Sequence, residues 1–224
     1  MGRLIMKKAF YIHFLYLLVI TLFIMSCAAD EVEVEIYSSD IQTAMEGEVI
    51  EVPLKAVFKL MGEDKDGNLP KAQEIAKKYL SKDSEMTITK GAYSSVLTIS
   101  TTIPLGIKKS MVEYLSKNVR IAMLLITKNK IVFVPNNKLD TLNAELQKIN
   151  FMLDVDIPAK KTLFRIVNDQ KKELKVSATA IFVNNKPYLN FKKALKRRKS
   201  EVLEFRGGEE SVYSEIPAHF NLEQ

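Results

Sequence analysis

The chain has 224 residues and a formal net charge of +6, with 47% hydrophobic and 27% charged residues. This ordinary globular composition excludes a disordered chain, a collagen-like repeat and a protein that crosses the membrane many times. A single cysteine excludes an internal disulfide and a cysteine-based zinc site.

The N-terminus has the layout of a secretory signal. Arg3, Lys7 and Lys8 form a basic start, residues 9–25 carry no formal charge, and small residues begin at Ser26. An apolar run of this length is also near the lower limit for a membrane-spanning helix. A retained anchor helix is therefore the alternative to a cleaved signal.

The sequence Ile-Met-Ser-Cys that ends at Cys27 resembles the lipobox of bacterial lipoproteins. The resemblance covers residues 1–27, and it implies that residues 1–26 are a signal peptide and that Cys27 carries a diacylglycerol. One acyl chain holds a protein weakly, whereas two or three anchor it stably. In this family an aspartate after the cysteine favours retention at the inner membrane. By the same resemblance, Ala28 implies the outer membrane, facing the periplasm, in a two-membrane bacterium, and the outer face of the plasma membrane in a one-membrane bacterium.

Strands and a short helix are predicted directly after the cysteine. Alternation of glutamate with valine and isoleucine over residues 31–36 predicts a half-buried strand. Ser39 and Asp40 can cap a short helix. Residues 48–60 form the next predicted strand, in which Pro53 indicates an edge position or a bulge.

The sequence Asp-Lys-Asp-Gly-Asn at residues 64–68 is similar to the opening of a calcium-binding loop. The sixth and twelfth positions of that motif need glycine and glutamate, but Leu69 and Ile75 stand there. An acidic turn before a helix explains the same residues, because negative charge is favourable at a helix N-terminus. We therefore expect no metal site.

The rest of the first part alternates between helices and strands. Pro70 begins a predicted helix as a first-turn proline, and its apolar face extends to Leu80. A helix over 109–117 is expected to bury Met111, Val112 and Leu115. The other predictions are a hairpin of residues 85–90 and 95–103 around Gly91, a central strand over 119–126 apolar on both faces, a strand over 131–134 and a helix over 138–150.

After residue 150 the pattern becomes rich in β-structure. The predicted strands are 153–157, 163–167, 174–183, 188–191 and 202–205, with turns at Asn168-Asp169 and Asn184-Asn185. The fold class is α+β: a mixed sheet with three or four short helices, followed by a sandwich-like C-terminal part. We divide the mature chain into an α+β domain (27–150), a β-rich domain or lobe (151–208) and a flexible tail (209–224).

The strongest charge feature is a basic run near the C-terminus. Six of eight consecutive residues are basic: Lys192, Lys193, Lys196, Arg197, Arg198 and Lys199. We expect no nucleic-acid partner, because no aromatic residues interleave the run and the signal directs the chain out of the cytosol. An anionic envelope surface is the candidate partner, and a solvated loop or charged edge strand is the alternative.

No catalytic residues are expected. His219 is the only histidine outside the signal, so a histidine-based triad would depend on it alone. No nucleotide-binding loop is present, and no cofactor is implied. Residues 183–188, which follow a long alternating strand, weakly resemble the end of small uncharacterised lipoproteins of proteobacteria and prophages. That resemblance implies an envelope lipoprotein and transfers no site residue.

The sequence therefore predicts a non-enzymatic envelope lipoprotein, bound to the membrane by its N-terminal lipid, with a binding or structural role. Its partner would be an envelope protein, lipid or glycan, and the oligomeric state is left open. One alternative is a periplasmic carrier or chaperone for a lipid or another amphiphile. A less favoured alternative is a cell-envelope hydrolase that uses carboxylates.

Overall fold

In the described part of the chain, a single mixed sheet of eleven strands organises the fold, and four helices pack around it. The structure is a computed structural model that describes residues 31–61, 64, 67–91, 94–128, 130–150, 153, 155, 159–206 and 219–223. The predicted signal peptide and Cys27 lie outside the described residues. The α+β class is confirmed, whereas the sandwich-like packing of the C-terminal strands stays a prediction.

The order of helices and strands along the chain agrees closely with the order that the sequence predicts. The helices are α2 (Ser38–Met45), α3 (Asn68–Ala76), α4 (Lys108–Lys117) and α5 (Lys138–Ile149). The strands are β1 (Glu31–Tyr37), β2 (Ile50–Met61), β3 (Glu85–Lys90), β4 (Ser94–Ile107), β5 (Ala122–Thr127), β6 (Lys130–Pro135), β7 (Lys161–Asn168), β8 (Leu174–Val183), β9 (Lys186–Leu195), β10 (Lys199–Arg206) and β11 (His219–Glu223).

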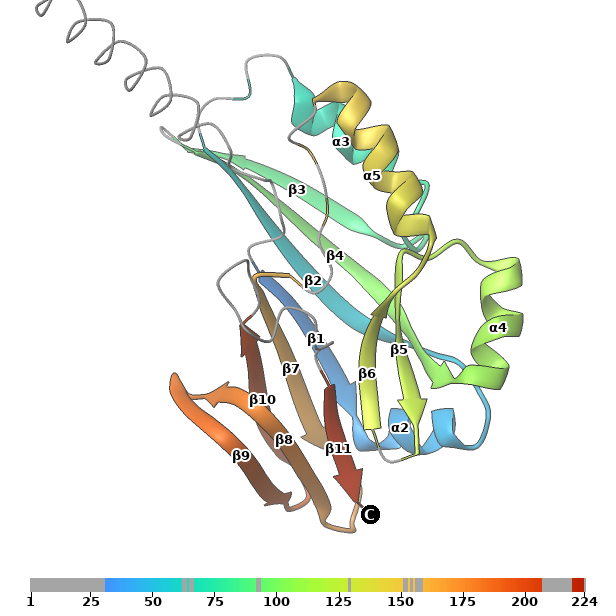
Figure 1. Cartoon of the computed structure of the whole chain (residues 1–224), viewed down its shortest axis with the longest axis vertical. Coiled ribbons are helices and arrows are strands. Elements are labelled where there is room, and N and C mark those ends of the chain that lie inside the picture. The colour runs from blue at the N-terminus through green and yellow to red at the C-terminus, as the bar shows by residue number, and fades with distance from the viewer. Residues whose placement is uncertain are drawn as a thin grey trace, which may run out of the picture.

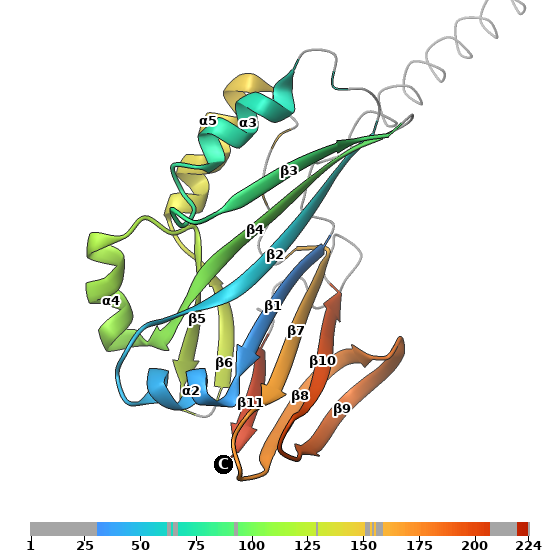
Figure 2. The same cartoon turned by 180° about the vertical axis from the view of Figure 1, so that it is seen from behind.

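The sheet curls strongly, so strands that are distant in its order face each other (Figures 1 and 2). Its order is β10-β7-β1-β2-β4-β5-β6-β11-β8-β9, with β3 on β4, and β10 also pairs with β8. The β1–β7 and β4–β5 pairs are parallel, and the others are antiparallel. Four strands separate β6 from β7, yet the rings of Phe133 and Phe164 pack edge to face at 6.2 Å. The concave face of the sheet therefore encloses the main hydrophobic core.

Strand β1 confirms the predicted alternation, because Val32, Val34 and Ile36 are buried. Its glutamates face outward, where Glu31 and Glu33 form ion pairs with Lys161 and Arg165 of β7 at 2.8 and 3.0 Å.

Proline 53 lies in an interior strand. Strand β2 runs between β1 and β4, but its pairing with β1 covers only Leu54 to Val57. Pro53 is the next residue, so it stands just past the paired segment. On the β1 side Pro53 has no partner among the described strands, so the sheet tolerates its missing N–H, and the predicted edge position holds locally although β2 is an interior strand.

Helix α2 begins one residue before the predicted cap. Asp40 accepts a hydrogen bond from the backbone N–H of Tyr37 at 3.1 Å, whereas the Ser39 hydroxyl donates to Asp169 at 2.6 Å. Asp169 also accepts from the hydroxyl of Ser38 and the N–H of Ser39. Although partial burial acts in the opposite direction, the hydrogen bonds from Ser38 and Ser39 lower the pKa of Asp169. The turn after β7 thus supplies the anion at this helix N-terminus.

Two predictions of burial between residues 109 and 126 are wrong. Met111 of α4 is buried as expected, but the side chain of Val112 is 65% exposed. The strand expected from residue 119 begins only at Ala122, and its burial alternates along the strand. One face of β5 carries the core residues Leu124 and Ile126, and the other is only partly covered.

The C-terminal part extends the same sheet. Strand β1 lies between β2 and β7, so strands from both sides of residue 150 are neighbours. Residues 219–223, assigned to a flexible tail in the sequence analysis, form β11 between β6 and β8. Asn184 and Asn185 have positive φ angles of 51° and 61°, which fit the predicted tight turn between β8 and β9.

Helices α3 and α5 lie side by side over the sheet, as both views show. The two helices and the segments just after them form a second hydrophobic cluster of Ala72, Tyr79, Leu142, Leu146 and Leu153. This cluster is separate from the core inside the curled sheet. The space between the two clusters holds the candidate site.

Candidate functional site

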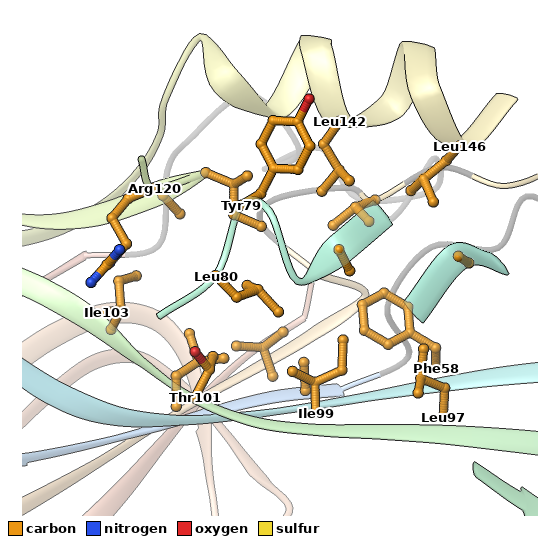
Figure 3. A pocket seen from close by; sticks show the side chains of 18 of the residues that line it. Phe58, Tyr79, Leu80, Leu97, Ile99, Thr101, Ile103, Arg120, Leu142 and Leu146 are labelled. Atoms are coloured by element: carbon orange, nitrogen blue, oxygen red, sulfur yellow. The ribbon is translucent and has the colours of Figure 1, made fainter. Parts of the chain in front are cut away.

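An apolar cavity of about 110 Å³ lies between the sheet and the pair of helices α3 and α5 (Figure 3). Its lining draws on both hydrophobic clusters and contains few polar groups. The lining residues are Val32, Leu54, Ala56, Phe58, Leu69, Ala72, Ala76, Tyr79, Leu80, Leu97, Ile99, Thr101, Thr102, Ile103, Arg120, Ile121, Ala122, Phe133, Leu142, Leu146, Leu153 and Val155.

The sheet side of the cavity follows from the period of two in a strand. Leu54, Ala56 and Phe58 of β2 alternate with outward residues, so they line the same face. Ala56 is opposite Val32 of β1 and Ile99 of β4, which also line the cavity. A small side chain between two larger ones leaves space above the sheet at this point.

The helix side is held by contacts that face away from the cavity. The hydroxyl of Tyr79 donates to Glu145 of α5 at 2.6 Å, and Lys78 forms an ion pair with the same carboxylate at 3.1 Å. The hydrogen bond to Glu145 raises the pKa of Tyr79, and hydrogen bonds from Tyr79 and Lys78 lower the pKa of Glu145. These contacts tie the end of α3 to α5, so only the apolar part of Tyr79 borders the cavity.

One end of the cavity coincides with an interruption in the pairing of β4. On one edge of β4, β3 pairs with residues 95–100 and β5 pairs with Leu105 to Ile107. Within the described strands, residues 101–104 have no partner on that edge. Thr101, Thr102 and Ile103 line the cavity here. The Thr101 hydroxyl is hydrogen-bonded to Ser81 and Ser84 at 3.1 and 2.6 Å, which satisfies it locally.

Arg120 lies at the same end, next to Ile103, whereas Leu146, Leu97 and Phe58 lie at the other end (Figure 3). The side chain of Arg120 is 15% exposed. One terminal nitrogen donates to the carbonyl of Val119 at 2.8 Å. The other terminal nitrogen donates to Glu51 of β2 at 3.1 Å.

Glu51 also accepts a hydrogen bond from the hydroxyl of Tyr114 in α4. Burial, followed by the hydrogen bond to Glu51, raises the pKa of Tyr114 to about 12, so this hydroxyl stays protonated. Two buried polar atoms of the cluster, Nε of Arg120 and Oε2 of Glu51, have no hydrogen-bond partner in the described part of the chain. Because buried polar groups are normally paired, these two atoms are the unusual feature of the site.

Residues 30–206 match a protein family that is described as a domain of unknown function, DUF7424. The chain belongs to the DUF7424 family. No curated protein and no solved structure matches the chain. The cavity and the Arg120–Glu51 pair both lie within the DUF7424 domain.

The predicted basic residues lie away from the cavity of the DUF7424 domain. Lys192 and Lys193 are on β9, and the other four residues form or flank the turn into β10. Lys193 is not free, because it pairs with Glu201. Lys199, at the end of the turn, pairs with Asn168 at the end of β7. The preceding residue of β7, Val167, pairs with Tyr37, so the turn lies near the C-terminal end of β1. The basic turn and the start of β1 are thus at opposite ends of the strands.

The structure supports the plain interpretation of the acidic turn before α3. Both carboxylate oxygens of Asp64 accept backbone N–H groups, from Asn68 at 2.7 Å and Leu69 at 2.9 Å. Asp64 therefore caps the helix. Among the described residues, no group of three or more His, Cys, Asp and Glu side chains could hold a metal ion. The side chain of His219 lies outside what the structure describes.

The sequence analysis missed the cavity, although Arg120 carried a signal. It is the one charged residue in the apolar run 119–126. The pairing that surrounds it is long-range, since Glu51 is 69 positions away. Within the part of the chain that the structure describes, no helix has the length and apolar character needed to cross a membrane.

Proposed function

We propose that the chain is a lipoprotein of the cell envelope, anchored through Cys27, whose DUF7424 domain binds the apolar part of a small amphiphile. This is the carrier alternative of the sequence analysis, and the cavity between the two hydrophobic clusters is the observation that supports it. The role is one of binding rather than catalysis.

The size and lining of the cavity favour an apolar ligand. An empty apolar cavity costs about 24 cal/mol per Å³, so roughly 110 Å³ corresponds to about 2.6 kcal/mol. A ligand that fills this space restores the lost packing contacts. Apolar cavities of about 150 Å³ stay dry and bind benzene, so a tail of about six carbons is a suitable size.

The position of the cavity relative to the proposed anchor supports the same function. Glu31 begins β1 four residues after Cys27, and four extended residues span at most about 14 Å. The next residue of β1, Val32, lines the cavity. A lipid on Cys27 would therefore hold the cavity close to the membrane from which an amphiphile could enter.

The hydrolase alternative gains no support from the two carboxylates that bind the cavity-lining residues Arg120 and Tyr79. Glu51 is bonded to Arg120 and Tyr114, and Glu145 is bonded to Tyr79 and Lys78. Both have the surroundings of structural ion pairs, and the two belong to different sides of the cavity. A structural or partner-binding role stays a prediction, and it is compatible with amphiphile binding by the same anchored domain.

Photolabelling of the full chain in its own membrane tests the proposal. An uncharged six-carbon alkyl diazirine should label peptides that contain β4 and α5 and spare peptides of the β8–β9 hairpin. Ala56→Leu occupies part of the cavity and should strongly reduce this labelling. Lys55→Leu, which adds the same side chain to the exposed face of β2, is the matched control and should leave it unchanged. Equal labelling in both variants, or none in the wild type, would contradict the proposal.

A further inference from the structure

Resting on the anchoring part of the proposed function, we infer that the domain makes a second contact with the membrane that holds Cys27. The contact surface is the basic end, a cluster of six exposed residues in two neighbouring turns: Lys171, Lys172, Lys196, Arg197, Arg198 and Lys199. These residues would bind the phosphate groups of the lipids. The domain would then lie along the membrane, with the lipid anchor at one end of β1 and the basic end at the other.

The two turns are joined by Asn168, the last residue of β7, which is completely buried. Its side-chain nitrogen donates to the carbonyl of Lys172, in the turn after β7, and to that of Leu195, at the end of β9, at 2.8 and 2.6 Å. Its own carbonyl accepts the N–H of Arg198 at 2.6 Å. The turn after β7 therefore brings Lys171 and Lys172 to the basic residues of the β9–β10 turn, which the linear run did not include.

The charge of the basic end is largely uncompensated. Among the described residues, none of its six members forms an ion pair, whereas the nearby Lys193 pairs with Glu201. The acidic residues of the same two turns are Asp169 and Glu173, and Asp169 already accepts hydrogen bonds at the start of α2. Six basic residues against two acidic ones leave a net charge of +4.

The backbone of the β9–β10 turn indicates that charge is kept there at the expense of turn geometry. The N–H of Lys199 donates to the carbonyl of Lys196 at 3.0 Å, and Arg198, in the third position of this turn, has a φ of 60°. Glycine or asparagine is favoured at such a position, and asparagines occupy it in the β8–β9 turn. In the described chain, Lys128 is the other charged residue with a positive φ, and its β5–β6 turn lies at the same end of the sheet (Figure 1). Strained residues of this kind cluster at functional sites.

The contact would be electrostatic, without insertion into the hydrocarbon. None of the strongly exposed large apolar residues in the described part of the chain lies in the two turns. Each basic side chain near an anionic membrane contributes roughly a fivefold gain in affinity. The guanidinium groups of Arg197 and Arg198 can bind phosphate oxygens in bidentate geometry. The basic end would thus rest at the level of the lipid phosphates, outside the reach of an alkyl probe in the hydrocarbon.

The short distance from the proposed anchor favours the same membrane over a second one. Strand β1 begins within about 14 Å of Cys27, and its seven residues span roughly 23 Å to Tyr37, close to the basic end. In an upright domain the basic end would lie beyond the screening length of about 8 Å and would gain nothing. In an inclined domain it reaches the phosphates, and the short tether keeps the effective concentration of this membrane high.

The accessibility of a cysteine beside the basic end tests the contact. Ser200→Cys stands next to Lys199 at an exposed position, and Val112→Cys on α4 is the control on the side opposite the β8–β9 hairpin (Figures 1 and 2). Cys27 is blocked by its proposed lipid. Each full chain is reconstituted into vesicles of phosphatidylcholine with or without phosphatidylglycerol and labelled with an uncharged poly(ethylene glycol) maleimide. Phosphatidylglycerol should slow the labelling of Ser200→Cys about tenfold and leave that of Val112→Cys unchanged.

Salt and charge reversal identify the cause of the protection. Sodium chloride at about 1 M shortens the screening length to about 3 Å and should restore the rate. Arg197→Glu combined with Arg198→Glu, in the Ser200→Cys chain, should restore it as well. The matched control, Lys82→Glu combined with Lys138→Glu, changes the net charge equally at exposed positions beside α3 and α5, and should leave the protection intact.

Flotation of the salt-washed vesicles before labelling separates this inference from the proposed function. A chain that does not float with the vesicles would overturn the proposed anchor. A chain that floats, but whose Ser200→Cys is labelled equally fast in both lipid mixtures, would overturn only the second contact. Protection of a chain in phosphatidylcholine vesicles that appears only when empty phosphatidylglycerol vesicles are added would also overturn it, because the basic end would then bind a second membrane.

Discussion

Filling the cavity by Ala56→Leu should stabilise the protein. Ala56 is buried in β2 between Val32 and Ile99, and the space above it is part of the cavity. Complete filling of about 110 Å³ would recover about 2.6 kcal/mol at roughly 24 cal/mol per Å³. One leucine occupies part of this space, so we expect a gain of about 1–2 kcal/mol in the free energy of unfolding.

Chemical denaturation of the chain, followed by far-UV circular dichroism, measures this change. The chain has no tryptophan, so circular dichroism is preferable to tryptophan fluorescence. In thermal unfolding a gain of 1 kcal/mol corresponds to about 2–4 °C in Tm for a domain of this size. The same variant should lose ligand labelling, so stability and binding are expected to change in opposite directions.

Ala178→Leu is the matched control for stability. Ala178 is 2% exposed in β8 and does not line the cavity. The added carbons would have to be forced into packed surroundings there, with an expected loss of about 1–3 kcal/mol. If Ala56→Leu is destabilised as much as Ala178→Leu, the space above Ala56 is not available and the reasoning from the cavity is refuted.

Three further predictions concern the anchor, a helix cap and the basic turn. Cys27→Ser should abolish both the acylation and the cleavage of the signal peptide, which intact mass and membrane partition would show. A mass that the substitution leaves otherwise unchanged would favour a retained anchor helix. Asp169→Ala should cost about 1 kcal/mol at neutral pH, as for a lost cap, and helix α2 should fray in hydrogen exchange. Because the folded-state pKa of Asp169 is lowered, its stabilisation exists above the unfolded pKa and disappears as pH falls through the folded pKa, so denaturation curves of variant and wild type should converge in acid. Glutamate in place of all four residues 196–199 should abolish sedimentation of the protein with added anionic vesicles, because each basic residue contributes about 1 kcal/mol to the free energy of binding. The protein should stay in its own membrane. Retained sedimentation with the vesicles would indicate that the turn is a solvated loop.

The local sequence pattern was sufficient to predict burial where one face of a helix or strand is buried and the other is exposed to solvent. The alternation in β1 and the apolar stripe of α5 predicted which residues are buried, because side-chain direction repeats every two or 3.6 residues. The same reasoning failed at Val112, since an apolar residue on a short helix can face solvent when no element packs over it.

Local pattern along the chain was enough for the α+β class, most element positions and the basic run, and it predicts the lipobox. Long-range packing, in contrast, places residues 219–223 between β6 and β8 and gives α3 and α5 a hydrophobic cluster separate from the sheet core. It also brought Arg120 to Glu51 and left a cavity beside them. A cavity is a difference between the volumes of side chains that meet from distant segments, and no local period encodes which segments meet.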